Sequence, residues 1–273
     1  MIKNKWRYLI LVFGVLLIWS NTGWAAKEQL GEIKPGIYSM AAISNHTPVI
    51  YKKAKEYWES LQKVELLIAK PEQFKDIPKL GLKEPYVGNI VLGDKQQKFG
   101  IIVDIVGEEK RLYIDKNGDG SFANESWAPL INEWLGIQNY WVTSPEPIDL
   151  QVAYNSLSGG TAPIQVFISG VLLKPGAFVK EKPYLLVKVR TWFLAKVPED
   201  GIEKYMAVVD HNNNGCFNDP EDMLIIDYDD DEIFSLKEAV KYKKGIKIRG
   251  GKNKFDVSWD VFPKELKIGG KDQ

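Results

Sequence analysis

The chain has 273 residues, of which 45% are hydrophobic and 26% are charged, so it can bury a sizeable core and is not a wholly disordered protein. Its 36 basic and 36 acidic residues balance, and it lacks the basic footprint that nucleic-acid binding requires. The one cysteine, Cys216, excludes an intrachain disulfide, which leaves packing and metal binding as sources of stability.

The first 25 residues are typical of a secretory signal peptide. They begin with Lys3, Lys5 and Arg7 and continue with an apolar run over residues 8–19. Small residues precede a cleavage position after Ala25. The run is shorter than the about 20 apolar residues of a membrane span, although an uncleaved anchor is the alternative. We therefore predict a secreted or periplasmic protein with no membrane span after signal removal.

Residues 26–82 are predicted to form an N-terminal segment with one short strand and one helix. The strand is expected around Gly36–Ala42. Apolar residues recur at three- and four-residue spacing from Tyr51 to Val64, which predicts an amphipathic helix. Pro71, Pro78 and Pro85 then interrupt regular structure.

From Tyr86 onward the pattern becomes β. Runs rich in β-branched and aromatic residues are separated by Gly, Pro, Asp or Asn. They predict strands at Tyr86–Leu92, Phe99–Val106, Arg111–Ile114, Ile148–Tyr154, Ile164–Leu173, Tyr184–Val197, Tyr205–Val209, Met223–Ile226, Gly245–Arg249, Lys254–Asp260 and Glu265–Ile268. Ser235 and Glu238 have capping-box spacing, which predicts a short helix over Ser235–Lys243. The predicted fold class is mainly β, an antiparallel sandwich-like arrangement with one N-terminal amphipathic helix and short helices.

Two parts of the β region repeat one pattern. Residues 86–122 and 184–217 each read as strand, turn, strand, turn, strand and acidic loop. The loops begin at Asp115 and Asp210, and each has Phe at its eighth position, Phe122 and Phe217. We predict two related β modules, 83–175 and 176–273, which either stand apart or form one continuous sandwich. Accidental similarity is the alternative explanation.

Both acidic loops carry oxygen-bearing side chains at positions 1, 3 and 5 and Gly at position 6. Calcium prefers six to eight oxygen ligands, and the Gly permits the turn that brings the carbonyl of position 7 to the ion. In the first loop we expect the ligands Asp115, Asn117, Asp119 and the Ser121 carbonyl, with Glu125 or Asn124 closing the site. In the second loop we expect Asp210, Asn212, Asn214 and the Cys216 carbonyl, closed by Asp219, Glu221 or Asp222.

The pattern Asp-x-Asn/Asp-x-Asp/Asn-Gly resembles the calcium loops of EF-hand-like proteins. It departs from a helix-loop-helix motif, because both flanks are strand-like and position 12 of the first loop is Ser126. Pro220 also disfavours a helix after the second loop. The loops are more similar to the strand-flanked form in extracellular β proteins, including the calcium-binding blades of integrin-type propellers. This resemblance covers only the loops and their flanks, and it implies calcium as a structural staple. Turns without any metal are the alternative.

Acidic residues dominate the stretch from Asp210 to Glu232, which contains no Lys or Arg. Its last part, Asp227–Glu232, is either a solvated acidic loop or an additional cation site, because carboxylates that lack compensating charge repel one another. The sequence leaves both readings open.

Histidine-dependent catalysis has little support. The chain has only His46 and His211, it lacks a Gly-x-Ser-x-Gly elbow, and it lacks a phosphate-binding loop. We therefore expect a non-enzymatic calcium-binding protein with a structural or binding role at the cell surface or in the periplasm. The alternative is a carbohydrate-binding module or a carboxylate-based glycan hydrolase that recognises a glycan or cell-wall polymer. Aromatic residues that could stack on sugars, or pack in the core, are Trp127, Trp134, Tyr140 and Trp141.

Overall fold

The computed structural model describes residues 30–44, 48, 54–136, 138–174, 177, 182–242, 246–250 and 253–269. The predicted signal peptide and His46 lie outside these residues. The described part is almost entirely antiparallel β structure, which confirms the predicted mainly β class. Its one α-helix is α2 (Ala54–Ser60), and two single turns of 3-10 helix lie at Asn155–Leu157 and Leu236–Glu238.

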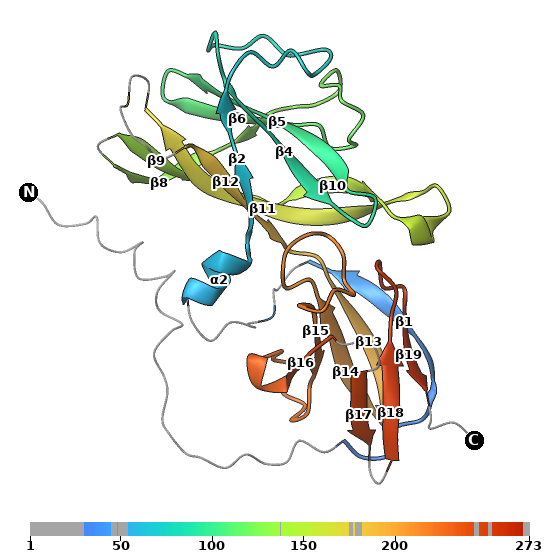
Figure 1. Ribbon diagram of the computed structural model, residues 1–273. Coiled ribbons are helices and arrows are strands. Elements are labelled where there is room, and N and C mark those ends of the chain that lie inside the picture. The colour runs from blue at the N-terminus through green and yellow to red at the C-terminus, as the bar shows by residue number, and fades with distance from the viewer. Residues whose placement is uncertain are drawn as a thin grey trace, which may run out of the picture.

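The largest sheet has eight strands and curls into a nearly closed, barrel-like shape in the lower part of Figure 1. Its order is β16-β15-β14-β13-β1-β19-β18-β17. The strands are β1 (Gly36–Ile43), β13 (Trp192–Glu199), β14 (Ile202–Val209), β15 (Met223–Ile226), β16 (Ala239–Lys241), β17 (Ile246–Gly250), β18 (Asn253–Ser258) and β19 (Glu265–Gly269). Because β1 pairs with both β13 and β19, the N-terminal segment joins two parts of the C-terminal sheet.

Two further sheets form the upper part of Figure 1. The six-stranded sheet has the order β2-β12-β11-β9-β8, and β10 also pairs with β11. Its strands are β2 (Gln62–Glu65), β8 (Ile131–Leu135), β9 (Asn139–Thr143), β10 (Ile148–Ala153), β11 (Thr161–Leu173) and β12 (Tyr184–Val189). The five-stranded sheet has the order of the chain, β3 (Leu67–Ile68), β4 (Tyr86–Leu92), β5 (Gln97–Val106), β6 (Glu109–Ile114) and β7 (Ala128–Pro129).

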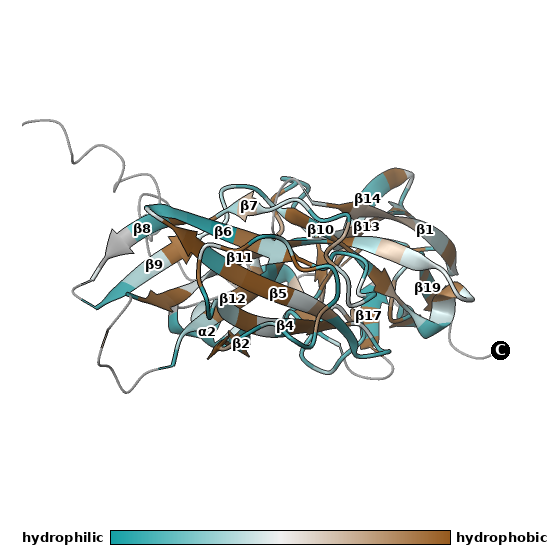
Figure 2. Cartoon of the chain, turned by 90° about the horizontal axis from the view of Figure 1, so that it is seen from above, coloured by the Kyte–Doolittle hydropathy of each residue, from teal (hydrophilic) through white to brown (hydrophobic). Residues whose placement is uncertain are grey.

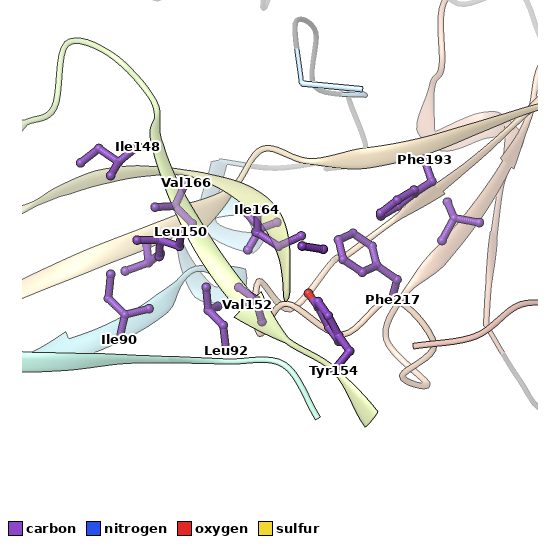
Figure 3. Packing of buried hydrophobic residues seen from close by; sticks show 14 of the residues in the cluster. Ile90, Leu92, Ile148, Leu150, Val152, Tyr154, Ile164, Val166, Phe193 and Phe217 are labelled. Carbon is purple, nitrogen blue, oxygen red and sulfur yellow. The ribbon is translucent and has the colours of Figure 1, made fainter. Parts of the chain in front are cut away.

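One hydrophobic core connects the three sheets. Figure 3 shows Ile90 and Leu92 of β4 beside Leu150 of β10, with Phe193 and Phe217 continuing the packing into the eight-stranded sheet. Burial alternates along β11, as expected for a strand with one face on the core. Figure 2 shows hydrophobic colour on parts of many strands, among them β5, and hydrophilic colour on many of the loops that join the strands. The acidic loops are therefore attached to a common core.

The predicted helix is too long at its C-terminal end. The helix α2 ends at Ser60, and Gln62–Glu65 form β2, which pairs with β12; residues 51–53 lie outside the described part. The strand pairs its backbone with β12 and buries Val64, and this tertiary pairing prevails over the helical spacing of the sequence.

Two other predicted elements also differ from the structure. The predicted strand Tyr184–Val197 is two strands, because the chain leaves the six-stranded sheet after Val189 and enters the eight-stranded sheet at Trp192. The predicted helix Ser235–Lys243 is one 3-10 turn followed by β16. The capping box of Ser235 and Glu238 is present, as the spacing predicts.

Candidate metal-binding loops

Loop 1 (Asp115–Glu125) and loop 2 (Asp210–Asp222) each connect two antiparallel neighbours. Loop 1 begins directly after β6 and leads to β7, which pairs with β6. Loop 2 begins directly after β14 and leads to β15, which pairs with β14. The strand flanks predicted from the sequence are therefore present in the structure.

In loop 1 the backbone wraps around the buried carboxylate of Asp115. This carboxylate accepts the backbone N–H groups of Gly118 at 2.8 Å, Asp119 at 3.1 Å and Gly120 at 2.8 Å. Asp119 in turn accepts the N–H of Ser121 at 2.8 Å. Both glycines have positive φ, 70° and 79°, which allows this tight curl.

Loop 2 has the same arrangement around Asp210, which is 1% exposed. Its carboxylate accepts the N–H groups of Asn214 at 3.3 Å and Gly215 at 2.7 Å. Asn214 accepts the N–H of Cys216 at 2.7 Å, as Asp119 does in loop 1. Positive φ again falls at positions 4 and 6, at Asn213 and Gly215.

A third loop repeats this geometry, although its residues were predicted only as an acidic stretch or an additional cation site. Loop 3 (Asp227–Glu238) begins directly after β15 and leads to β16, which pairs with β15. Asp227 accepts the N–H groups of Asp231 and Glu232, each at 3.2 Å, and Asp231 accepts that of Ile233 at 2.7 Å. Positions 4 and 6, Asp230 and Glu232, have φ of 57° and 60°.

The acidic side chains of loop 3 also converge. Asp227, Asp229 and Asp231 each place a carboxylate oxygen within 4.8 Å of the others, so this cluster could hold a metal ion. Position 12 of the loop is Glu238, which is 6% exposed and accepts the N–H of Tyr228 at 3.1 Å. The Asp-x-Asp-x-Asp spacing of positions 1, 3 and 5 is the sequence feature that could have identified this loop as a third repeat. Position 6, however, is Glu232, where the other two loops have Gly.

Position 8 is Phe in all three loops, and each ring is packed against another aromatic ring. Phe122 contacts Phe74 with ring centres 5.2 Å apart. Phe217 contacts Phe193 at 4.8 Å, and Phe234 contacts Trp192 at 5.2 Å. The Phe at position 8 therefore anchors each loop to an aromatic ring of the protein interior.

The residues predicted to close loops 1 and 2 have different surroundings. Glu125 accepts the backbone N–H of Lys116 at 3.0 Å and lies 3.5 Å from its ammonium group, while Asn124 is exposed. In loop 2, one oxygen of Asp219 accepts the side-chain amides of Asn212 and Asn214, so the fold brings these three predicted ligands together.

Asp222 closes loop 2 from inside the protein, whereas Glu221 is exposed. The Asp222 carboxylate accepts the N–H groups of His211 at 3.0 Å and Asp219 at 2.7 Å. It therefore ties the start of the loop to its end.

Burial dominates the electrostatics of loop 2. Burial raises the pKa of Asp210 to about 7, and burial together with the nearby charge of Asp210 raises the pKa of Asp222 to about 9. Two buried carboxylates disfavour joint ionisation unless a cation compensates them. Burial also raises the pKa of the Cys216 thiol to about 12, so this side chain is a small filler rather than a nucleophile.

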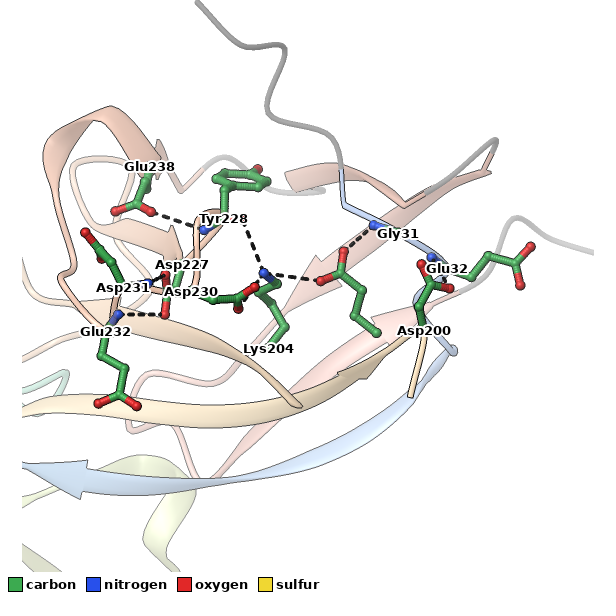
Figure 4. A network of polar contacts seen from close by, with 11 residues as sticks. Gly31, Glu32, Asp200, Lys204, Asp227, Tyr228, Asp230, Asp231, Glu232 and Glu238 are labelled. Carbon is green, nitrogen blue, oxygen red and sulfur yellow. Dashed lines mark hydrogen bonds and ion pairs between the residues drawn. The ribbon is translucent and has the colours of Figure 1, made fainter. Parts of the chain in front are cut away.

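Loop 3 is connected by an ion-pair network to the first described residues. Figure 4 shows Lys204 of β14 between this loop and the N-terminal segment. Its ammonium group lies 2.7 Å from Asp230 and 3.4 Å from Glu199, and Glu199 accepts the backbone N–H of Gly31. Lys204 is only 3% exposed, so water screens its positive charge weakly. This charge lies beside the acidic residues of loop 3.

The aromatic residues singled out from the sequence make separate contacts. Trp127 is 42% exposed beneath the guanidinium of Arg111, and Trp141 packs edge-on against Trp58, which is 45% exposed. The ring of Tyr140 lies under the ammonium of Lys110, while the side chain of Trp134 is outside the described part.

Comparison with known proteins finds no match among family models, curated proteins or solved structures. Among the described helices, none has both the length and the apolar character needed to cross a membrane. The fold and the loops define the class of the protein, an antiparallel β protein in which an acidic loop follows each of three strands.

Proposed function

We propose that this is an exported calcium-binding protein, in which cations in the acidic loops staple neighbouring strands together. Its role is structural or binding, at the cell surface or in the periplasm. The observation that supports this function most strongly is the repetition of one backbone geometry in three loops. In each loop the carboxylate of a buried Asp, directly after a strand, accepts hydrogen bonds from the backbone N–H groups of positions 5 and 6.

Calcium is the cation that suits the available donors. The loops offer carboxylate, amide and backbone carbonyl oxygens, and calcium accepts six to eight of these with variable geometry. Magnesium demands a stricter octahedron and keeps several waters. The arrangement supports the likeness to strand-flanked, EF-hand-like loops, and the core shared by the five- and six-stranded sheets supports a sandwich-like description of that part.

We expect the affinity to differ among the loops because their charges differ. Loop 3 has Asp at positions 1, 3 and 5 and Glu238 at position 12, although Lys204 offsets part of this charge. Loop 1 has Asp at positions 1 and 5. Loop 2 has Asn at positions 3 and 5 and depends on Asp219 and Asp222 for further charge. A larger number of charged ligands favours tighter binding.

Thermal unfolding in EDTA and then in millimolar calcium tests the proposal. Binding to the folded state alone stabilises by about 2.7 kcal/mol at a hundredfold excess over Kd, so the Tm should rise by several degrees. Three variants, one per loop, should each reduce this rise while leaving the fold intact, because the altered side chains are not fully buried: Asp119→Ala, Asn214→Ala and Asp229→Ala.

The matched control is Asp256→Ala, which removes an exposed carboxylate from β18 and should leave the calcium effect unchanged. Magnesium at the same concentration should give a smaller shift. A calcium shift that all three loop variants retain, or no shift at all, would show that the loops are turns without metal.

A glycan-binding role is the second candidate, supported by the exposure of Trp58 and Trp127. An exposed ring face of Trp58, or the face of Trp127 that is not under the Arg111 guanidinium, could stack on a sugar ring. Retention on an insoluble cell-wall polysaccharide that is weakened by Trp58→Ala or Trp127→Ala would support it. A wild-type protein that passes through unretained would count against it.

A further inference from the structure

The hairpin between β4 and β5 forms hydrogen bonds with both loop 1 and loop 2. The backbone N–H of Gly93 donates to the carbonyl of Asn214 in loop 2 at 2.9 Å. The side-chain amide of Gln97 donates to the carbonyl of Asn117 in loop 1 at 2.8 Å. Gly93 has φ of 75°, and an added Cβ would lie 2.8 Å from a methyl group of Val152, so the hairpin fits closely in this position.

The end of β10 and the residue that follows it, Tyr154, also contact both loops. The N–H of Gln151 donates to the carbonyl of Lys116 in loop 1 at 2.8 Å. The hydroxyl of Tyr154 donates to the carbonyl of Gly215 in loop 2 at 2.7 Å. Tyr154 is fully buried, and burial raises the pKa of its hydroxyl, which therefore stays a donor. Figure 3 shows its ring at the end of β10 beside Phe217 of loop 2.

Gln97 joins these contacts into one path. Its Oε1 accepts the N–H of Ala153 at 2.7 Å, while its Nε2 donates to the carbonyl of Asn117. Ala153 is the chain neighbour of Tyr154, whose hydroxyl holds Gly215. The carbonyl of Asn117 in loop 1 is thus linked to the carbonyl of Gly215 in loop 2. The link runs through the side-chain amide of Gln97 and the hydroxyl of Tyr154.

We propose that Gln97 and Tyr154 are positioning residues that couple loops 1 and 2, so that a cation in one loop raises the affinity of the other. This inference rests on the proposed calcium binding. A bound cation fixes the backbone of its loop, and the shared hairpin and β10 then hold the second loop in the same closed geometry. The first cation that binds bears the entropic cost of ordering the hairpin and β10. The second cation then binds without that cost, which gives positive cooperativity.

A calcium titration followed by NMR at the amides of Gly120 and Gly215 reads each loop separately. Asp119→Ala, in loop 1, should weaken calcium binding at Gly215 by about fivefold or more. Asn212→Ala, in loop 2, should weaken binding at Gly120 by the same factor, because coupling between two sites is reciprocal. In a Tyr154→Phe or Gln97→Leu background, each loop variant should leave the affinity of the other loop unchanged.

Tyr86→Phe is the matched control, since it removes a hydroxyl that bonds a backbone carbonyl at 2.6 Å, on Leu173, away from both loops. It should preserve the coupling. Loops that titrate independently in the wild-type background would overturn the coupling and leave calcium binding intact. No response at either amide would overturn both. If Tyr154→Phe does not fold, the part-exposed Gln97→Leu provides the same comparison.

Discussion

Phe217→Ala is expected to lower the free energy of unfolding by about 3–5 kcal/mol. Phe217 is fully buried, and its ring packs edge-on against Phe193 in the continuous core. Its carbonyl accepts the indole N–H of Trp259, and its N–H donates to Val261 at 3.0 Å. Truncation therefore leaves a cavity at the point where loop 2 is fixed to the eight-stranded sheet.

Urea unfolding measures this effect, and Phe167→Ala is the matched control. Phe167 lies on the part-exposed face of β11, with the guanidinium of Arg190 over its ring, so its truncation should cost about 1 kcal/mol. In thermal unfolding, the Phe217 variant should melt about 6–20 °C below the wild type. A cost as small as that of the control would contradict the role of Phe217 as the anchor of loop 2.

The metal-free protein is expected to lose stability as the pH rises from about 4 to about 9. The folded state raises the pKa of Asp210 to about 7 and that of Asp222 to about 9, above the ordinary value of 3.8. Between these limits the folded state binds more protons than the unfolded state, so stability falls with rising pH. Burial shifts the pKa of Asp227 and Glu238 in the same direction.

Calcium should remove this loss, because it binds the ionised carboxylates and displaces their protons. Its stabilising effect should therefore grow with pH. His211 acts oppositely, since burial lowers its pKa and its contribution to stability rises through about pH 6.5. Unfolding curves at several pH values in EDTA measure the slope, which Asp222→Asn should flatten. Stability that rises across the whole range in EDTA would contradict the account.

Local patterns in the sequence were sufficient to predict most strands and the acidic loops. Tyr86–Leu92 and Met223–Ile226 have the predicted bounds, because β-branched runs between turn residues act through neighbours in the chain. Loop 3 was predicted as an acidic stretch, either solvated or an additional cation site, and its likeness to the other two loops was not predicted. Glu232 adopts the αL conformation, which makes the backbone of loop 3 like that of the other loops. Glu rarely adopts this conformation, so nothing in the sequence indicated it.

Contacts between distant segments could not be predicted. The sequence of β1 gives no indication that it pairs with both β13 and β19, and Val64 has helical spacing although it lies in β2. Both outcomes depend on pairing with partners more than a hundred residues away. The link between loops 1 and 2 through Gln97 has the same origin, since only the folded chain brings these residues together.

A crystal structure in the presence of calcium, with an anomalous difference map, tests the central claim most directly. We expect peaks in the acidic loops, with carboxylate oxygens of Asp115, Asp210 and Asp227 or of their partners about 2.3–2.6 Å from each ion. Loop 3, which has the most carboxylates, should be occupied at the lowest calcium concentration. A well-ordered structure at millimolar calcium with no peak in any of the three loops would contradict calcium binding as the function of these loops.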